Sequence, residues 1–192
     1  NLGIILKDLG KLKEAEFYTR KAIKLSPNYA IAHSNLGGIL KDLGKLKEAE
    51  FYTRKAIELN PKYHNAYSNL GIILKDLGKL KEAEISILNA IEINPNFSSA
   101  YFSLSTLKCS NKNKIWKQKL FSKGFLDNKK INEQIDIYFA RANFLHNDKK
   151  YLESSRYLKL ANQLKFDFKK SQTNSRINKS KILLIESNKE QI

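Results

Sequence analysis

The first half of the chain consists of short amphipathic segments that end at a glycine or before a proline. Apolar residues over 36–43 follow the i, i+3, i+4, i+7 spacing that places them on one face of a helix. A helix over 30–43 is expected to stop at Gly44, because glycine readily adopts the left-handed conformation that ends a helix. A second helix over 46–59 is expected to stop before Pro61, which cannot continue it. The pattern therefore predicts two helices joined by a short turn.

This helical pair recurs every 34 residues. The three copies share an unchanged string, LKDLGKLKEAE, at residues 6–16, 40–50 and 74–84. Chance does not return so long a string three times in fixed phase, so we interpret the first half as three copies of one unit. Small residues such as Gly37 and Ala49 would let the two helices of a unit approach closely. One pair cannot bury its apolar face alone, so stacked units are the stable form.

Residues 1–97 resemble the tetratricopeptide repeat, a family of helical-hairpin arrays. The resemblance rests on the period and on Leu-Gly at positions 7 and 8, Gly at 15, Ala at 20 and 27, and Pro at 32 of each unit. It implies an all-α fold, a right-handed solenoid of antiparallel helix pairs whose first helices line a concave groove. Position 24 departs from the family, because the usual bulky aromatic is replaced by Thr19 and Thr53, and by Ile87 in the third unit.

The first unit is truncated, because its first five positions are missing. The chain also contains no methionine. We therefore expect the sequence to be part of a longer protein.

Residues 98–134 are predicted to form a degenerate fourth helical hairpin. Its first helix keeps apolar residues in phase, but at residues 109–113 a polar turn replaces the glycine turn of the three preceding units. A basic amphipathic helix is predicted over 115–126, with Ile115 and Trp116 on its apolar side.

Residues 135–168 look like a divergent fifth hairpin of the same kind. Tyr151, Leu158 and Ala161 fall where a second helix of the repeat has core residues. The remaining residues, 169–192, are predicted to be a C-terminal cap or linker with one short helix around 177–184.

The second half also resembles the region of bacterial tetratricopeptide-containing sulfotransferases that joins their repeats to their catalytic domain. The resemblance covers residues 113–192. In that family the next segment carries a Pro-Arg-Ser-Gly loop that binds phosphosulfate, and this chain ends before any such loop. The resemblance implies that the repeats recruit substrate for a sulfotransferase domain beyond Ile192.

Charge leaves the nature of a partner open. The chain has 35 basic and 19 acidic residues, a net charge of +16. Residues 1–97 carry 15 basic and 11 acidic residues, whereas residues 98–192 carry 20 and 8. AT-rich codon use, which favours Lys, Asn and Ile, accounts for much of this excess, and an acidic partner for the second half is the alternative. No specific nucleic-acid binding is expected.

Motifs for catalysis, metal binding or cofactor binding are not found in the sequence. The Gly-Lys pairs of the turns lack the other residues of a phosphate-binding loop. His33, His64 and His146 have no partners at ligand spacing, and Cys109 is the only cysteine. We therefore expect no enzyme activity, no cofactor and no metal site in this chain. No apolar run approaches the roughly 20 residues of a membrane span, and a single cysteine suits a cytoplasmic protein.

The candidate binding residues lie on the first helices. Asparagine recurs at position 6 of each unit, and the family resemblance places this position in the concave groove. An asparagine amide offers both a donor and an acceptor, so a ladder of them can hold an extended backbone without reading its side chains. Lysine at position 12 would bind acidic groups. The predicted groove residues are Asn1, Asn35, Asn69, Lys41, Lys75, Ser34 and Ser68.

The function expected from these residues is a protein–protein interaction scaffold that binds an extended peptide or protein segment. The alternative interpretation of the asparagine ladder is duplication of one unit with a solvated groove wall. Capture of a peptide C-terminus is disfavoured, because the positions of the family's carboxylate clamp hold Ser34 and Gly38, then Ser68 and Ile72. Self-association through the uncapped first unit is a further expectation.

Overall fold

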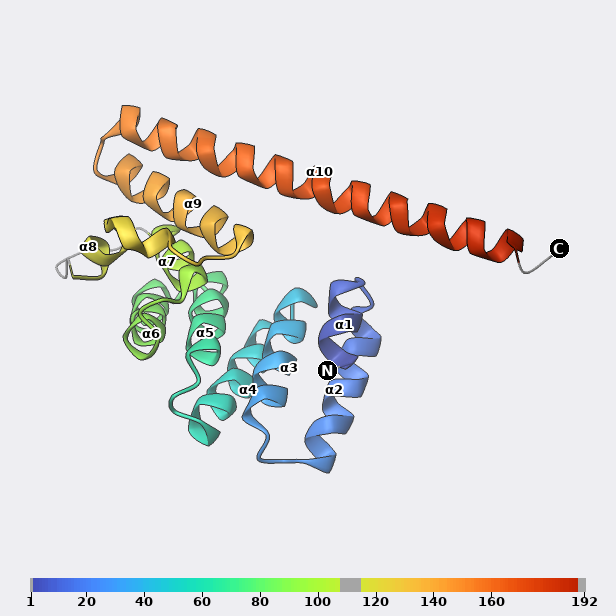
Figure 1. The fold of residues 1–192 in the computed structure, drawn as a ribbon. Coiled ribbons are helices and arrows are strands. Elements are labelled where there is room, and N and C mark those ends of the chain that lie inside the picture. Colours follow the sequence, from blue (N-terminus) through green and yellow to red (C-terminus); the bar gives the residue numbers. More distant parts are fainter. Residues whose placement is uncertain (1, 108–114, 190–192) are drawn as a thin grey trace. The chain divides into compact units, whose positions relative to one another are not determined.

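The computed structural model describes residues 2–107 and 115–189, with side chains as far as Asn174. All regular elements in these ranges are helices (Figure 1), and none of them is long and apolar enough to cross a membrane. The chain divides between Phe125 and Leu126 into two compact units. The helices are α1 (Leu2–Asp8), α2 (Leu12–Leu25), α3 (Ala30–Asp42), α4 (Leu46–Leu59), α5 (His64–Asp76), α6 (Leu80–Ile93), α7 (Ser98–Ser105), α8 (Ile115–Phe121), the 3-10 helix η1 (Lys123–Leu126), α9 (Ile131–Asn147) and α10 (Tyr151–Lys189).

The helix ends of the repeat are set by glycine and proline, as predicted. Helix α4 has the predicted bounds, and α3 ends one residue earlier than expected. Gly44 has a φ of 76°, the left-handed conformation. Its N–H donates to the carbonyl of Lys41, and the next N–H, that of Lys45, donates to the carbonyl of Leu40. These two hydrogen bonds form a Schellman motif, which satisfies carbonyls that the helix end leaves free.

The two helices of a unit meet at the glycine of position 8. A methyl group on Gly37 would lie 3.1 Å from the carbonyl oxygen of Ala49 and still closer to the hydroxyl of Thr53. Ala49 and Thr53 are fully buried, and the Thr53 hydroxyl donates a 2.7 Å hydrogen bond to the Ala49 carbonyl. A short side chain at position 24 therefore fits the close contact between α3 and α4. In the third unit Ile87 occupies this position, against Gly71.

Successive units share their cores. Leu36 and Leu40 of α3 pack with Ala49 of α4 and Ile73 of α5 in one buried cluster, and Ile23 of α2 packs against it. Each first helix contacts the first helix of the next unit, and each second helix also packs on the following first helix. The compact part of the chain that ends at Phe125 is therefore a tetratricopeptide-like solenoid of antiparallel helix pairs, which confirms the predicted fold class.

The array changes after α7, and the structure corrects two predictions there. The helix predicted over 115–126 stops at Phe121, and η1 follows it. Its last turn closes through Ser122, whose hydroxyl donates to the Lys119 carbonyl at 2.8 Å, and Gly124 then favours a break. Ile115 is exposed rather than packed, whereas Trp116 is buried.

The division of the chain at Phe125 falls inside the segment predicted as a fourth hairpin, 98–134. The predicted turn at 109–113, which includes Cys109, lies outside the described residues.

The second compact part of the chain, which begins at Leu126, contains α9 packed on the first part of α10 (Figure 1). This pair corresponds to the hairpin expected over 135–168. The hydroxyl of Ser154 on α10 donates a 2.8 Å hydrogen bond to the carbonyl of Ala142 on α9, and Ala161 is fully buried. Two residues expected in its core, Tyr151 and Leu158, are instead exposed.

The prediction of a separate short helix around 177–184 is wrong. Residues 151–189 form one continuous α10 of 39 residues. The stretch contains no glycine or proline that would stop a helix, so the polar residues after 168 do not interrupt it.

Two neighbouring glycines of α3 allow a direct test of the close helix contact. Gly37→Ala places a methyl group against the backbone of α4, so we expect the free energy of unfolding to fall by about 1–3 kcal/mol. Gly38→Ala is the matched control, because its methyl group would meet only the Lys7 ammonium, at 3.7 Å. This control should gain up to about 1 kcal/mol from helix propensity. Urea unfolding followed by circular dichroism measures both, and equal effects would contradict the packing argument.

Candidate functional site

The predicted binding residues lie on a surface that we call the first-helix face, defined by Asn35 and Lys41 of α3 and Asn69 and Lys75 of α5. All four side chains are partly exposed. The contacts of α3 with α5 bring the two pairs to neighbouring helices. Asn1, the first member of the predicted ladder, lies outside the described residues.

The asparagine ladder contacts the neighbouring unit. The Nδ2 of Asn69 donates a 3.1 Å hydrogen bond to the Oγ of Ser34 in the preceding unit. Ser34 and Ser68 were predicted to line the groove, but they are only 1% and 3% exposed. Their hydroxyls therefore lie within the array rather than on its surface. The Oδ1 of Asn69 has no hydrogen-bond partner in the described part of the chain, and it is not sealed from solvent.

Asn35 lacks the equivalent hydrogen bond. Its Nδ2 is shielded from solvent and has no hydrogen-bond partner among the described residues. The Nδ2 of Asn69 is thus occupied and that of Asn35 is shielded, which leaves Oδ1 as the polar atom that a ligand would meet.

The lysines at position 12 differ in their partners. Asp42 lies between two of them: its Oδ2 is 3.2 Å from the Lys7 Nζ, and its Oδ1 is 3.0 Å from the Lys41 Nζ. Burial by itself would raise the pKa of the Asp42 carboxyl, but hydrogen bonds from Lys41 and Lys7 outweigh burial and lower it. Lys75 has no ion pair within residues 2–107 and 115–174, so its charge is available to a ligand.

Comparison with known families identifies the repeat. Three sequence models of the tetratricopeptide repeat match residues 1–29, 30–63 and 52–85. These residues form tetratricopeptide repeats.

Solved tetratricopeptide structures resemble the chain. The first tetratricopeptide domain of Spaghetti (RPAP3), bound to the HSP90 peptide SRMEEVD, is 28% identical over 62% of this chain and 88% of that chain, with a TM-score of 0.51. The Arabidopsis OM64 tetratricopeptide domain, 24% identical over 53% of this chain and 84% of that chain, has the same TM-score and shows the fold alone. A search of curated proteins gave no significant match. None of these comparisons supports the sulfotransferase resemblance of residues 113–192.

Ion pairs join the second helices of successive tetratricopeptide units, a feature that we did not predict from the sequence. The Nε of Arg20 donates to Glu16 within α2 at 2.9 Å, and its Nη2 donates to Glu48 of α4. The Nζ of Lys45 lies 2.9 Å from the Oε2 of Glu16. The same arrangement recurs one unit later with Glu50, Arg54, Lys79 and Glu82.

The signal for this network was present in the sequence as a charge pattern with the period of the repeat. Arginine at position 25 occurs only where the next unit supplies Lys at 16 and Glu at 19. In the third unit Leu88 takes the place of the arginine, and Glu84, the equivalent of Glu50, forms no ion pair within the described residues.

A double-mutant cycle tests the bond between Asn69 and Ser34. Removing either partner leaves the other unpaired in a partly buried contact, so the two substitutions to Ala should be non-additive by about 0.5–1.5 kcal/mol in unfolding free energy. Asn35→Ala is the control, because its Nδ2 has no partner to lose and its replacement should cost less than Asn69→Ala. Additive effects of the Asn69 and Ser34 substitutions would show that the bond does not stabilise the array.

The network also predicts a pH dependence of stability. Burial raises the pKa of the Glu50 carboxyl, but hydrogen bonds from Arg54 and Lys79 outweigh burial and hold it below the ordinary 4.5. A lowered pKa in the folded state stabilises the protein above pH 4.5, and this contribution is lost as pH falls through the folded-state pKa. Glu50→Gln should therefore destabilise the protein at pH 7, by about 0.5–1 kcal/mol.

Urea unfolding at pH 7 and at successively lower pH measures this difference, which should shrink as the pH falls through the folded-state pKa, because Glu50 then loses the charge that glutamine lacks. Glu84→Gln is the matched control and should have little effect at any of these pH values. A Glu50→Gln effect that persists in acid would contradict the ionic origin of the stabilisation.

Proposed function

We propose that the chain is a protein-interaction scaffold that binds an extended segment of a partner protein across the first-helix face. One observation carries the proposal: this face repeats an asparagine amide and a lysine at the interval of the tetratricopeptide unit, at Asn35 and Lys41 and again at Asn69 and Lys75. The similar RPAP3 domain is a tetratricopeptide array with a bound peptide, and this similarity supports binding as the role of the array. The role is one of binding rather than catalysis.

The asparagines would recognise the backbone of the segment. Hydrogen bonding to Ser34 fixes the orientation of the Asn69 amide, so its Oδ1 is already positioned before a ligand arrives. An extended chain presents its N–H groups at regular intervals, and each Oδ1 would accept a hydrogen bond from one of them. A group that is already ordered loses little conformational entropy on binding. Such contacts do not depend on the side chains of the partner.

The lysines would select segments that carry acidic side chains. Lys75 has no ion pair within the described residues, and its ammonium can therefore bind a carboxylate of the ligand directly. Lys41 already contacts Asp42, so a ligand carboxylate would share or displace that contact. Ser34 and Ser68 contribute indirectly, because they are buried and position the asparagines.

The ligand is expected to be an internal segment rather than a chain end. Ser34, Gly38, Ser68 and Ile72 occupy the positions at which other members of the family bind a terminal carboxylate. None of these four side chains carries a positive charge. A free C-terminus would therefore gain nothing over an internal peptide.

A peptide library bound to the whole chain tests the proposal. The double substitution Asn35→Ala/Asn69→Ala should weaken most captured peptides about tenfold or more, because each of the two lost hydrogen bonds contributes about 0.5–1.5 kcal/mol. Lys75→Glu should weaken the acidic peptides selectively, and it leaves the contact with Ser34 intact. Fluorescence anisotropy with captured peptides measures the affinities, and circular dichroism checks that helicity is retained.

Two matched controls lie on second helices, where Asn89→Ala on α6 and Lys24→Glu on α2 change the same residue types away from the first-helix face. Neither control should affect peptide affinity. Equal losses in the controls and in the first-helix variants, or no capture by the original chain, would overturn the proposal.

A further inference from the structure

A second regular surface lies on the second helices. Position 22 of each tetratricopeptide unit holds a large apolar residue that is exposed: Phe17 of α2 is 63% exposed, Phe51 of α4 is 64% exposed and Ile85 of α6 is 59% exposed. Exposed apolar residues scattered singly are ordinary, but three at the same position of successive units form a row. These three side chains are not part of the buried core of the array.

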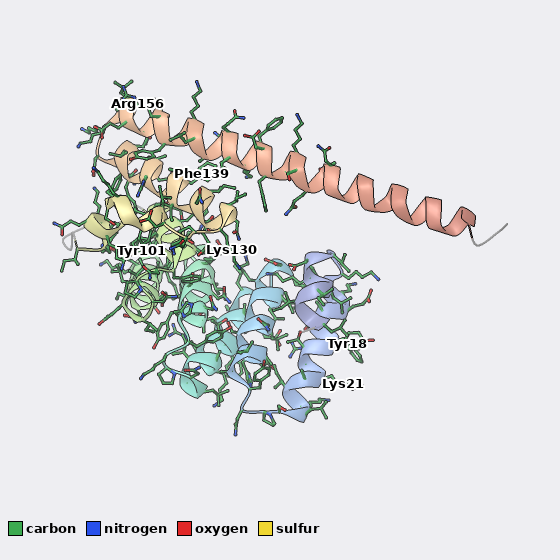
Figure 2. The ribbon with its side chains drawn as sticks, viewed as in Figure 1. Tyr18, Lys21, Tyr101, Lys130, Phe139 and Arg156 are labelled. Carbon is green, nitrogen blue, oxygen red and sulfur yellow. The ribbon has the colours of Figure 1, made fainter. Side chains whose placement is uncertain are left out.

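Each phenylalanine of this row contacts the ring of the tyrosine that follows it in the sequence. Phe51 contacts Tyr52 edge-on, with ring centroids 5.3 Å apart. Tyr52 is in turn fixed by the preceding unit, because Arg20 donates a 2.9 Å hydrogen bond to its hydroxyl and lies over its ring. Phe17 makes the same edge-on contact with Tyr18 (labelled in Figure 2). Phe51 therefore packs against a fixed ring, and an ordered side chain loses little conformational entropy when a partner covers it.

Unpaired lysines accompany the apolar row. One turn before each apolar residue, position 18 holds Lys13, Lys47 and Lys81, which are exposed and form no ion pair within the described residues. The nearby carboxylates are already occupied: Glu48 and Glu82 bind arginines of the preceding unit. The charge that this surface offers a partner is therefore positive.

We propose that this surface binds an acidic amphipathic segment of a partner protein. We call it the outer row, and it consists of six residues: Phe17, Phe51 and Ile85 with Lys13, Lys47 and Lys81. Apolar side chains of the segment would cover the row, and its carboxylates would pair with the three lysines. The inference goes beyond the proposed function, because it uses the other layer of helices and shares no residue with the first-helix face. The chain would then hold two different segments at once.

A second copy of this chain fits the outer row less well. Lysine lies on both sides of Phe17, as Lys13 and Lys21, and on both sides of Phe51, as Lys47 and Lys55. Two copies with their rows in contact would place lysines opposite lysines, and like charges across an interface oppose association.

An anionic membrane fits the outer row less well than a protein segment does. Residues 1–97 carry 15 basic and 11 acidic residues, so the repeats lack the large basic excess that attracts an anionic lipid surface. A polypeptide can instead place its carboxylates on the three lysines alone.

The test uses the whole chain and a fluorescein-labelled helical peptide of about 20 residues, with leucine at helical spacing and glutamate beside it. We expect binding by fluorescence anisotropy, and a loss of at least tenfold for Lys13→Glu/Lys47→Glu/Lys81→Glu and for Phe17→Ser/Phe51→Ser. These side chains are exposed, so folding should be retained, as circular dichroism checks. A peptide with lysine in place of glutamate should not bind.

The matched control is Lys41→Glu/Lys75→Glu on the first-helix face, which should leave the affinity for this peptide unchanged. An equal loss in that control would assign the peptide to the first-helix face and overturn the inference, while leaving the proposed function in place. No binding by the original chain would also overturn it. Binding to phosphatidylserine vesicles would overturn the inference as well, if the outer-row variants lose that binding and the peptide does not bind.

Discussion

The array depends on one close approach, where the two helices of each unit cross at the glycine of position 8. At Gly37 the backbone of α3 comes so near to α4 that a single methyl group would meet the Ala49 carbonyl. Thr53 faces this glycine, and its hydroxyl donates a hydrogen bond back to the Ala49 carbonyl of its own helix. Because the crossing is repeated at Gly71, consecutive units have the same geometry, and residues at equal positions line up in rows.

The stacking of units then decides which polar groups remain for binding. Each unit completes the core of its neighbour, and polar side chains join the units: Asn69 bonds to Ser34, and Arg20 bridges Glu16 and Glu48. These groups stabilise the array and are not free to act elsewhere. What remains is the Oδ1 of the asparagines with Lys75 on one layer of helices, and the outer row on the other. The two candidate surfaces are therefore consequences of the same packing.

The sequence predicted the repeated part of the fold because its signals are local. Gly44 and Pro61 mark helix ends, and the bounds of α4 follow from them. Contacts between units were harder to predict, since the bond from Asn69 to Ser34 joins residues 35 apart and requires the stacking geometry. We expected a break before 177–184 from polarity alone, but polar residues are compatible with a helix where no glycine or proline intervenes. The exposed phenylalanines were visible in the sequence, although only the structure shows that the core leaves them out.

The most direct test of the central claim, that the first-helix face binds an extended protein segment, is a nuclear magnetic resonance titration of the whole chain with a captured peptide. Our account predicts that the backbone resonances of α3 and α5 and the side-chain amides of Asn35 and Asn69 shift in a saturable way. Resonances of Phe51 and Lys47 on α4 should remain unchanged. Shifts confined to α4 and α6, or spread evenly over both layers of helices, would contradict the account.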